Sequence, residues 1–222
     1  MVPYFDRDGI TIYNARCEDV LPSIDPASVD LVLTDPPYGI GLRTDYAARG
    51  RGLSPKWHKA RNYPPVAGDD EPFDPAPLIG YGRCVLFGAN NYADRLPASP
   101  SWIVWDRLTG TTDAADAELA WTNLGGTVRM FTHLWSGICR GSEVGWHVHP
   151  TQKPVALMRW IVDRWTKPGD LVLDPYMGSG PVAQACHELG RRYIGVELVE
   201  DYCEVAVGRL AQQTLDLDGG AG

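Results

Sequence analysis

The sequence predicts an α/β fold, and three features of the chain support that prediction. Two short apolar runs, residues 31–33 and 171–173, have the composition of buried strands. Each run leads directly into a polar motif, TDPPY at residues 34–38 and DPYMGSG at residues 174–180. A helical pattern of apolar residues precedes the second run, at residues 154–165. Because α/β sheets bind ligands beyond the carboxyl ends of their strands, both motifs are candidate ligand sites.

The other elements of the first half follow from local patterns, in chain order. Residues 10–14 indicate a strand, and a helix is expected to begin near residues 17–21. The strand before the first motif spans residues 29–34. Two further strands are predicted at residues 84–88 and 102–105.

The second half begins with an ambiguous segment, because residues 114–121 fit either a short helix or an extended stretch. From residue 154 onward the patterns are regular. They predict a helix at 154–165, a strand at 171–174, a helix at 181–189 closed by Gly190, a strand at 193–197, a helix from about 200 to 213, and a frayed tail at 215–222.

Size and composition are those of one globular domain. The chain has a mass of 24.4 kDa and no internal repeat or linker, so residues 1–222 are expected to form a single domain. No run of about 18 apolar residues occurs, and the N-terminus lacks a signal-peptide pattern. The five cysteines are odd in number and have no paired spacing. These features predict a cytoplasmic protein with reduced thiols and no membrane segment.

Three motifs in a fixed order point to a family. They are residues 34–38, His149-Pro150-Thr151-Gln152-Lys153-Pro154, and residues 174–180. Together they resemble the motifs of amino DNA methyltransferases of the β group, in a small form similar to phage or prophage enzymes, and residues 10–24 and 193–203 are similar to that family as well. The resemblance implies a Rossmann-like class I methyltransferase fold, a mixed and mostly parallel sheet with helices on both faces. It also implies S-adenosyl-L-methionine as methyl donor and DNA as substrate in a bacterial or phage-encoded enzyme.

The first motif suits chemistry on an exocyclic amine, whose lone pair is delocalised into the base. The Asp35 carboxylate and the Pro36 carbonyl can accept both N–H groups and free that lone pair. Pro36 restricts Asp35 to an extended conformation, and Pro36 and Pro37 provide no competing N–H. Tyr38 offers a ring on which a flipped base can stack. The expected catalytic residues are therefore Asp35, Pro36, Pro37 and Tyr38.

The second motif is a glycine loop that opens a helix. Its glycines allow a ligand to approach the backbone closely, and Pro181 suits a first helical position. The resemblance assigns this loop to the methionine moiety, and Glu197 to both ribose hydroxyls. Tyr176, Pro181 and Ala15-Arg16 depart from the family's usual Phe, Thr and Gly-Asp. The expected cofactor-binding residues are Asp35, His149, Thr151, Gln152, Lys153, Asp174, Tyr176, Gly178, Ser179, Gly180 and Glu197.

Two other readings of these residues are weaker. Gly178-x-Gly180-x-x-Ala183 with Glu197 also fits a dinucleotide-binding fingerprint, but a nicotinamide enzyme has no need of residues 34–38 or of the HPTQKP motif. Cys139, His147 and His149 match no common zinc spacing, so no metal is expected.

The charge distribution indicates where DNA binds. The formal net charge is −8, yet residues 42–64 contain six cations against the single acid Asp45. Residues 42–75 have no apolar periodicity and are too long for an ordinary connection, which is typical of a lid or a binding loop. The expected DNA-binding residues in this basic lid are Arg43, Arg49, Arg51, Lys56, Lys59 and Arg61.

The resulting functional prediction is methylation of adenine N6 in DNA, because Asp at the first motif position favours adenine in this family. The alternatives are N4-cytosine methylation, methylation of RNA or of a protein amide, and a catalytically silent DNA-binding domain. The expected target-recognition region, residues 122–148, is short. Its length favours a short or relaxed target, recognition shared with the basic lid, or help from a second subunit in a homodimer.

Overall fold

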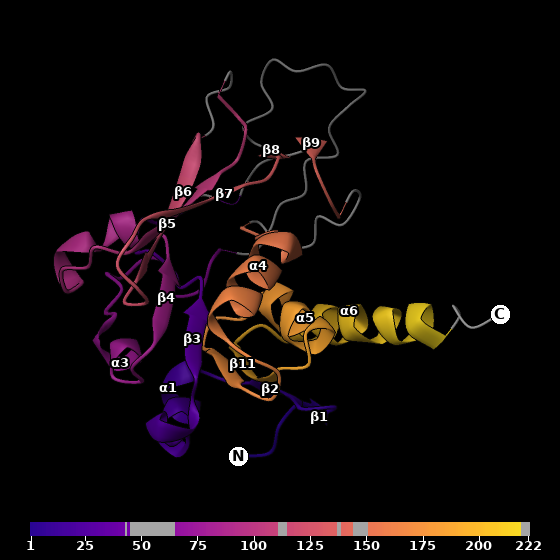
Figure 1. Cartoon of the computed structure of the whole chain (residues 1–222). Helices are drawn as coiled ribbons and strands as arrows, with labels where there is room; N and C mark the ends of the chain where they lie inside the picture. The colour runs from indigo at the N-terminus through magenta and orange to yellow at the C-terminus, as the bar shows by residue number, and fades with distance from the viewer. Residues whose placement is uncertain (43, 45–64, 111–114, 137–138, 144–150, 219–222) are drawn as a thin grey trace.

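The computed structural model describes residues 1–42, 44, 65–110, 115–136, 139–143 and 151–218, with the side chains of residues 212–218 left out of the description. Figure 1 shows the arrangement of its elements. The strands are β1 (Phe5–Arg7), β2 (Ile10–Asn14), β3 (Leu31–Thr34), β4 (Cys84–Phe87), β5 (Trp102–Asp106), β6 (Ala117–Thr122), β7 (Arg129–Thr132), β8 (Trp135–Ser136), β9 (Cys139–Arg140), β10 (Leu171–Asp174) and β11 (Arg192–Glu197). The α-helices are α1 (Cys17–Val20), α3 (Ala76–Ile79), α4 (Val155–Trp165), α5 (Pro181–Glu188) and α6 (Glu200–Asp218).

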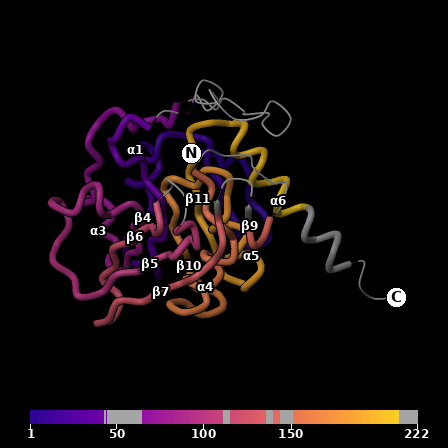
Figure 2. The backbone as a smooth tube through the Cα atoms, turned by 90° about the horizontal axis from the view of Figure 1, so that it is seen from above, coloured from indigo at the N-terminus to yellow at the C-terminus, as the bar shows by residue number. Residues whose placement is uncertain are grey.

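A mixed sheet of nine strands organises the described residues, in the order β1-β2-β11-β10-β3-β4-β6-β5-β7. The five central neighbours from β2 to β4 are parallel, whereas β6 runs antiparallel to both β4 and β5. β8 and β9 form a separate antiparallel pair. Seen from above, α4 and α5 lie beside the central strands, and α6 leads away from them toward the C-terminus (Figure 2). This mostly parallel sheet with helices confirms the predicted Rossmann-like class.

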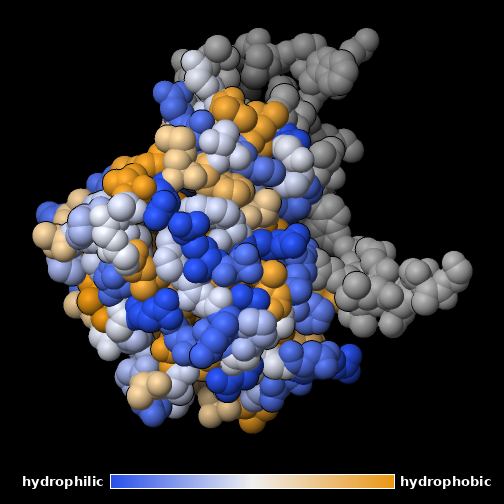
Figure 3. Space-filling view, viewed as in Figure 1, coloured by the Kyte–Doolittle hydropathy of each residue, from blue (hydrophilic) through white to orange (hydrophobic). Residues whose placement is uncertain are grey.

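One face of the molecule is largely polar. The face shown in Figure 3 is mostly hydrophilic, with small hydrophobic groups among the polar residues. Large exposed hydrophobic side chains come from separate segments and include Ile40, Leu108 and Met130. Among the residues described, no helix combines the length and the apolar character needed to cross a membrane.

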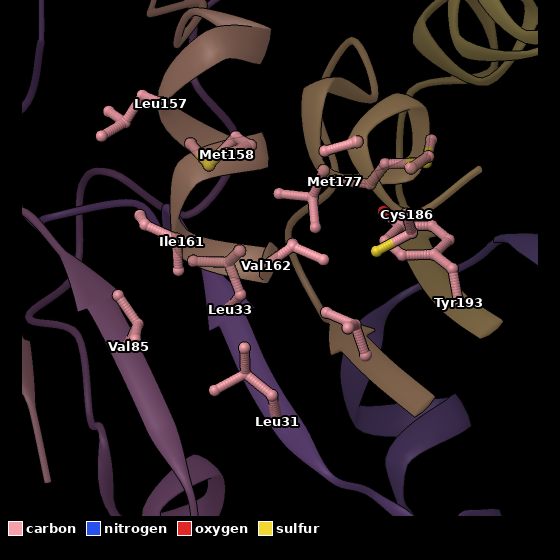
Figure 4. Packing of buried hydrophobic residues seen from close by; sticks show 14 of the residues in the cluster. Leu31, Leu33, Val85, Leu157, Met158, Ile161, Val162, Met177, Cys186 and Tyr193 are labelled. Atoms are coloured by element: carbon pink, nitrogen blue, oxygen red, sulfur yellow. The ribbon is translucent and has the colours of Figure 1, made fainter. Parts of the chain in front are cut away.

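Alternation along the strands supplies two large hydrophobic cores, one on each face of the sheet, beside a small cluster of Cys17, Val20 and Val196. In β3, Leu31 and Leu33 belong to one core and Val32 to the other, because successive side chains of a strand point to opposite faces. The first core lies under α4, α5 and α6; in Figure 4, Ile161 and Val162 of α4 lie over Leu33. The second core includes Leu78 of α3 and, after β4, Ala89 and Tyr92. The central strands are therefore covered on both faces, which explains their continuous apolar sequences.

Most elements match the sequence-based prediction, and the differences are local. Within the ambiguous segment 114–121, residues 117–121 belong to strand β6, which pairs with both β4 and β5, so the extended alternative is correct there and the helix is not. Helix α6 continues to Asp218, so the prediction of a frayed tail was wrong for residues 215–218. Strands β1 and β7 and the short helix α3 were not predicted, since three or four residues carry too little periodicity. In the predicted target-recognition region, residues 122–148, the described residues 122–136 contain β7 and β8.

Candidate active site

The two predicted motifs lie side by side because β3 and β10 are parallel neighbours, with Leu31 opposite Val172 and Val32 opposite Leu173. Their carboxyl ends therefore meet at one edge of the sheet. There the Thr34 hydroxyl donates a buried hydrogen bond of 2.6 Å to Asp174 Oδ1. This bond joins the first residue of one motif to the first residue of the other, and both motifs border the same site.

Protein groups satisfy the Asp174 carboxylate. Besides Thr34, the Tyr193 hydroxyl donates to Oδ2 at 3.2 Å, and the Tyr176 backbone N–H donates to Oδ1 at 3.3 Å. Asp174 is only 2% exposed, and burial raises the pKa of its carboxyl group from 3.8 to about 7. Its side chain, predicted to bind the cofactor, therefore connects β3, β10 and β11 and sets the position of the loop that follows.

The turn after the first motif is organised by Asp69. Its Oδ1 accepts hydrogen bonds of 2.9 Å from the backbone N–H groups of Tyr38 and Gly39, and its Oδ2 accepts one of 2.6 Å from Leu42. Asp69 is 4% exposed, so these amides provide the donors that a buried carboxylate needs. The sequence reasoning missed this residue, because one acid in the run Asp69-Asp70-Glu71 carries no distinguishing signal.

Tyr38 lies against the backbone of Gly88, which directly follows β4. A side-chain carbon at Gly88 would come within 2.0 Å of the Tyr38 ring, and Gly88 has a φ of 66°. Only glycine suits both requirements without strain. The Tyr38 hydroxyl donates a hydrogen bond to Asp35 Oδ1, and burial raises the pKa of Tyr38 well above its ordinary value. A glycine that ends a buried strand was the available sequence signal for this close contact.

Lys153 contacts the Asp35 carboxylate directly. Its Nζ lies 2.5 Å from Asp35 Oδ2 and 3.1 Å from Glu118 Oε2 on β6. The sequence reasoning placed Lys153 among the cofactor-binding residues and did not predict Glu118. Burial raises the pKa of Asp35, an effect that Lys153 partly offsets. Burial would lower the pKa of Lys153, but Asp35 and Glu118 outweigh it and raise that pKa, so the ammonium stays charged.

The glycine loop has the conformation that its sequence predicted. Gly178 and Gly180 have φ values of 54° and 76°, and Gly180 caps α5 with Pro181 in its first turn. A side-chain carbon at Gly180 would lie 2.7 Å from the Ala206 Cβ of α6. Glu197, at the end of β11, accepts a 2.9 Å hydrogen bond from the Gly178 N–H on Oε2. The loop and the predicted ribose-binding carboxylate are thus in contact.

The loop contains one buried polar atom that the described part of the chain leaves without a hydrogen-bond partner, Ser179 Oγ. Ser179 is 2% exposed, and an unpaired hydroxyl in such a place is costly. A polar group of a ligand seated on the loop would satisfy it. Beside it, the Glu197 carboxylate has lone pairs left for ribose hydroxyls, and burial raises its pKa. This donor and acceptor set fits the predicted S-adenosylmethionine.

The HPTQKP segment leads into α4. Gln152 is buried; its amide donates to Glu143 Oε1 at 3.1 Å, while Glu143 Oε2 accepts a 3.0 Å bond from the Val155 N–H at the start of α4. Thr151 is half-buried immediately before it. Tyr176 packs edge-on against Phe73 at 5.9 Å between ring centroids. His149 and the six cations Arg43, Arg49, Arg51, Lys56, Lys59 and Arg61 lie outside the described residues, as does most of the predicted basic lid.

Comparison with known proteins also indicates a methylase. A family model described as DNA methylase matches residues 103–208. YubD of Escherichia coli (strain K12), a protein provisionally named a methylase, is 31% identical over 224 residues that cover 92% of each chain.

Two solved structures share the fold. The PvuII DNA methyltransferase, described as cytosine-N4-specific, has a TM-score of 0.63 at 14% identity and covers 93% of this chain and 88% of its own. The complex of M1.HpyAVI with SAM has a TM-score of 0.53 at 22% identity, over 90% of this chain and 99% of its own.

Proposed function

Because this chain belongs to the N6/N4 DNA methylase family, we propose that it transfers a methyl group from S-adenosylmethionine to the N6 amine of adenine in DNA. One observation carries the proposal. Asp35 stands at the carboxyl end of β3, directly beside the glycine loop that follows β10, and the Thr34–Asp174 hydrogen bond holds the two together. A carboxylate for an amine and a loop for a methyl donor therefore border one site.

Residues around the glycine loop hold the methyl donor in this proposal. Gly178, Ser179 and Gly180 accommodate its methionine end, with Thr151, Gln152 and His149 from the HPTQKP segment, and Glu197 accepts its ribose hydroxyls. Asp174 and Tyr176 set the conformation of the loop, because the Asp174 side chain accepts hydrogen bonds from the Thr34 hydroxyl and from the Tyr176 backbone N–H. When bound, S-adenosylmethionine supplies an electrophilic methyl group on a sulfonium sulfur.

The first motif orients the target base. A carboxylate has about four lone-pair positions. Tyr38 and Lys153 each occupy one lone-pair position of the Asp35 carboxylate, on different oxygens, so positions remain for an amine N–H. The Pro36 carbonyl accepts the second N–H, and the half-buried Tyr38 ring, supported by Gly88, stacks on the flipped base. The proton that the methylated amine must lose passes to Asp35.

The basic lid, residues 42–75, completes DNA recognition in this proposal, either alone or together with a second subunit. The six cations of the lid contact phosphates that flank the flipped base, and residues 122–148 read the target sequence. The choice of adenine rests on Asp35, because the family resemblance associates Asp at this position with adenine. N4-cytosine is the competing base, and its support is the structural likeness to the PvuII enzyme.

Nucleoside analysis of DNA treated with the purified protein and isotopically labelled S-adenosylmethionine tests the proposal. We expect labelled N6-methyladenine. Labelled N4-methylcytosine alone would contradict the base assignment, and label confined to RNA or protein would contradict the substrate class. Asp35→Ala is expected to lower the rate about 10²–10³-fold, since one preorganised acceptor is lost. Asp94→Ala, at an exposed aspartate, is the matched control and should keep the parent rate.

A further inference from the structure

A buried lysine lies between two carboxylates at the proposed catalytic residue. The Lys153 side chain is 5% exposed, and its Nζ contacts Asp35 at 2.5 Å and Glu118 at 3.1 Å. The same Nζ lies 3.3 Å from the Tyr38 hydroxyl and 5.5 Å from the centroid of the Phe87 ring. An ammonium so enclosed is stable only when charged partners replace its lost hydration.

Glu118 is itself held in place. Arg107 Nη1 lies 3.2 Å from Glu118 Oε1, and Arg107 Nε and Nη2 each donate to the Trp135 carbonyl at 3.1 Å. The Trp135 indole N–H then donates to the Gln152 carbonyl at 3.1 Å. The contacts link Arg107, directly after β5, to Glu118 on β6 and to Trp135 on β8, which in turn contacts the residue before Lys153. They therefore hold the lysine through both its side chain and its backbone.

We propose that Lys153 is a positioning residue that keeps the Asp35 carboxylate ionised and oriented for the target amine. Glu118, anchored by Arg107, shares the positive charge of Lys153, so that Asp35 remains a strong hydrogen-bond acceptor. The charges alternate in sign along Arg107, Glu118, Lys153 and Asp35. The inference deepens the proposed function and rests on its assignment of Asp35.

The surroundings of Asp35 leave few other charges to consider. Within the described ranges, the groups that face it electrostatically are Lys153, Glu118, Tyr38, Tyr92 and Asp174. Burial raises the pKa of both tyrosines, so they stay neutral. Burial also raises the pKa of Asp174, to about 7. Lys153 favours the ionised form of Asp35 and Glu118 opposes it, so removing each charge must have opposite effects.

A direct test measures the pKa of the Asp35 carboxyl by ¹³C NMR on the full chain without DNA, with labelled aspartate and the resonance assigned from its absence in Asp35→Asn. Lys153→Met should raise this pKa by about 1–3 units, because a cation in contact is lost. Glu118→Gln, which preserves shape, should lower it. Lys153→Arg should keep it near the parent value. The acidic limb of the pH profile of single-turnover methyl transfer should shift in the same directions.

Glu188→Gln is the matched control, since Glu188 forms an ion pair of 3.0 Å with Arg159 between α5 and α4, and neither pKa nor pH profile should move. Unchanged pKa values of Asp35 in Glu118→Gln and Lys153→Met, or shifts of the same sign, would overturn the inference. If Lys153→Met does not fold, the sign of the Glu118→Gln shift decides alone. Full turnover by Asp35→Asn would instead refute the proposed catalytic site, an outcome that the NMR shifts do not depend on.

Discussion

The Thr34 hydroxyl donates to Asp174 Oδ1 at 2.6 Å, across 140 residues of sequence. Both residues are almost completely buried, at 1% and 2% exposure. The bond ties the strand end that carries Asp35 to the strand end that carries the glycine loop. The relative position of the proposed base-binding and donor-binding halves of the site depends on this bond.

Thr34→Val should destabilise the fold by about 1–3 kcal/mol, because the methyl group conserves shape but leaves a buried carboxyl short of a donor. Urea denaturation of parent and variant measures the difference. Thr34→Ser keeps the hydroxyl and serves as the control, with a smaller loss. Equal stability of Thr34→Val and the parent would show that Asp174 does not need this donor.

Asp174→Asn should change how stability depends on pH. The pKa of Asp174 is raised to about 7 in the folded chain, so between about pH 4 and pH 7 the unfolded chain ionises this group while the folded chain keeps it protonated. The folded state binds more protons in that window, and stability therefore falls as the pH rises, with the loss complete above about pH 7. The variant lacks this contribution, so its free energy of unfolding should fall less over the window. Parallel curves for the two proteins would contradict the raised pKa.

Gly88→Ala should impair methylation through Tyr38. A carbon at this position would overlap the Tyr38 ring, and a φ of 66° strains any residue with a side chain. Displacing Tyr38 also removes a hydrogen bond from Asp35, so we expect the rate to fall about 10²-fold, as for other misplaced catalytic groups. Gly208→Ala in α6, where the added carbon meets no atom within 4 Å, should instead stabilise the protein by about 0.5–1 kcal/mol. A Gly88→Ala enzyme with parent activity would mean that the ring position is unimportant.

Glu197→Gln should weaken binding of S-adenosylmethionine about tenfold or more, the equivalent of one hydrogen bond to a charged acceptor. The amide also replaces an acceptor that now serves the Gly178 or Val199 N–H, so a modest loss of stability should accompany the change. Calorimetric titration measures the affinity, with Glu188→Gln as a control outside the site. An unaltered dissociation constant would exclude Glu197 from ribose binding.

Neutralising Arg49, Arg51, Lys56 and Lys59 together should weaken DNA binding and flatten its dependence on salt. Each phosphate contact contributes about 0.9 to the slope of log affinity against log salt concentration. This prediction rests on the sequence, because the four residues lie outside the described structure. Neutralising Arg164 and Lys167, which precede β10 at the opposite edge of the sheet, is the control. Cofactor affinity should be unchanged in both variants, and an unchanged salt slope would make the basic lid a solvated loop.

Local patterns in the sequence predict most of the regular elements of the fold. The apolar runs of β3 and β10 and the helical spacing of α4 predicted these elements within one or two residues, because burial of a strand or of one helix face leaves a periodic signal. The two motifs supplied the proposed chemistry, and their backbone is constrained, since an aspartate before proline and a loop of paired glycines each favour particular backbone conformations. Where periodicity was too short, as in β1 and β7, the prediction failed.

The tertiary structure alone decided which residues meet. Lys153 and Asp35 are 118 residues apart, and their contact depends on where α4 begins relative to β3. Glu118 joins them only because β6 turns back between β4 and β5. Asp69 and Gly88 likewise acquire their roles from neighbours that the order of strands brings close. The local sequence determines the conformational propensity and hydrophobicity of a residue, whereas the packing of distant segments determines which charges and shapes its side chain faces. The electrostatic environment of Asp35 is therefore decided by the tertiary structure.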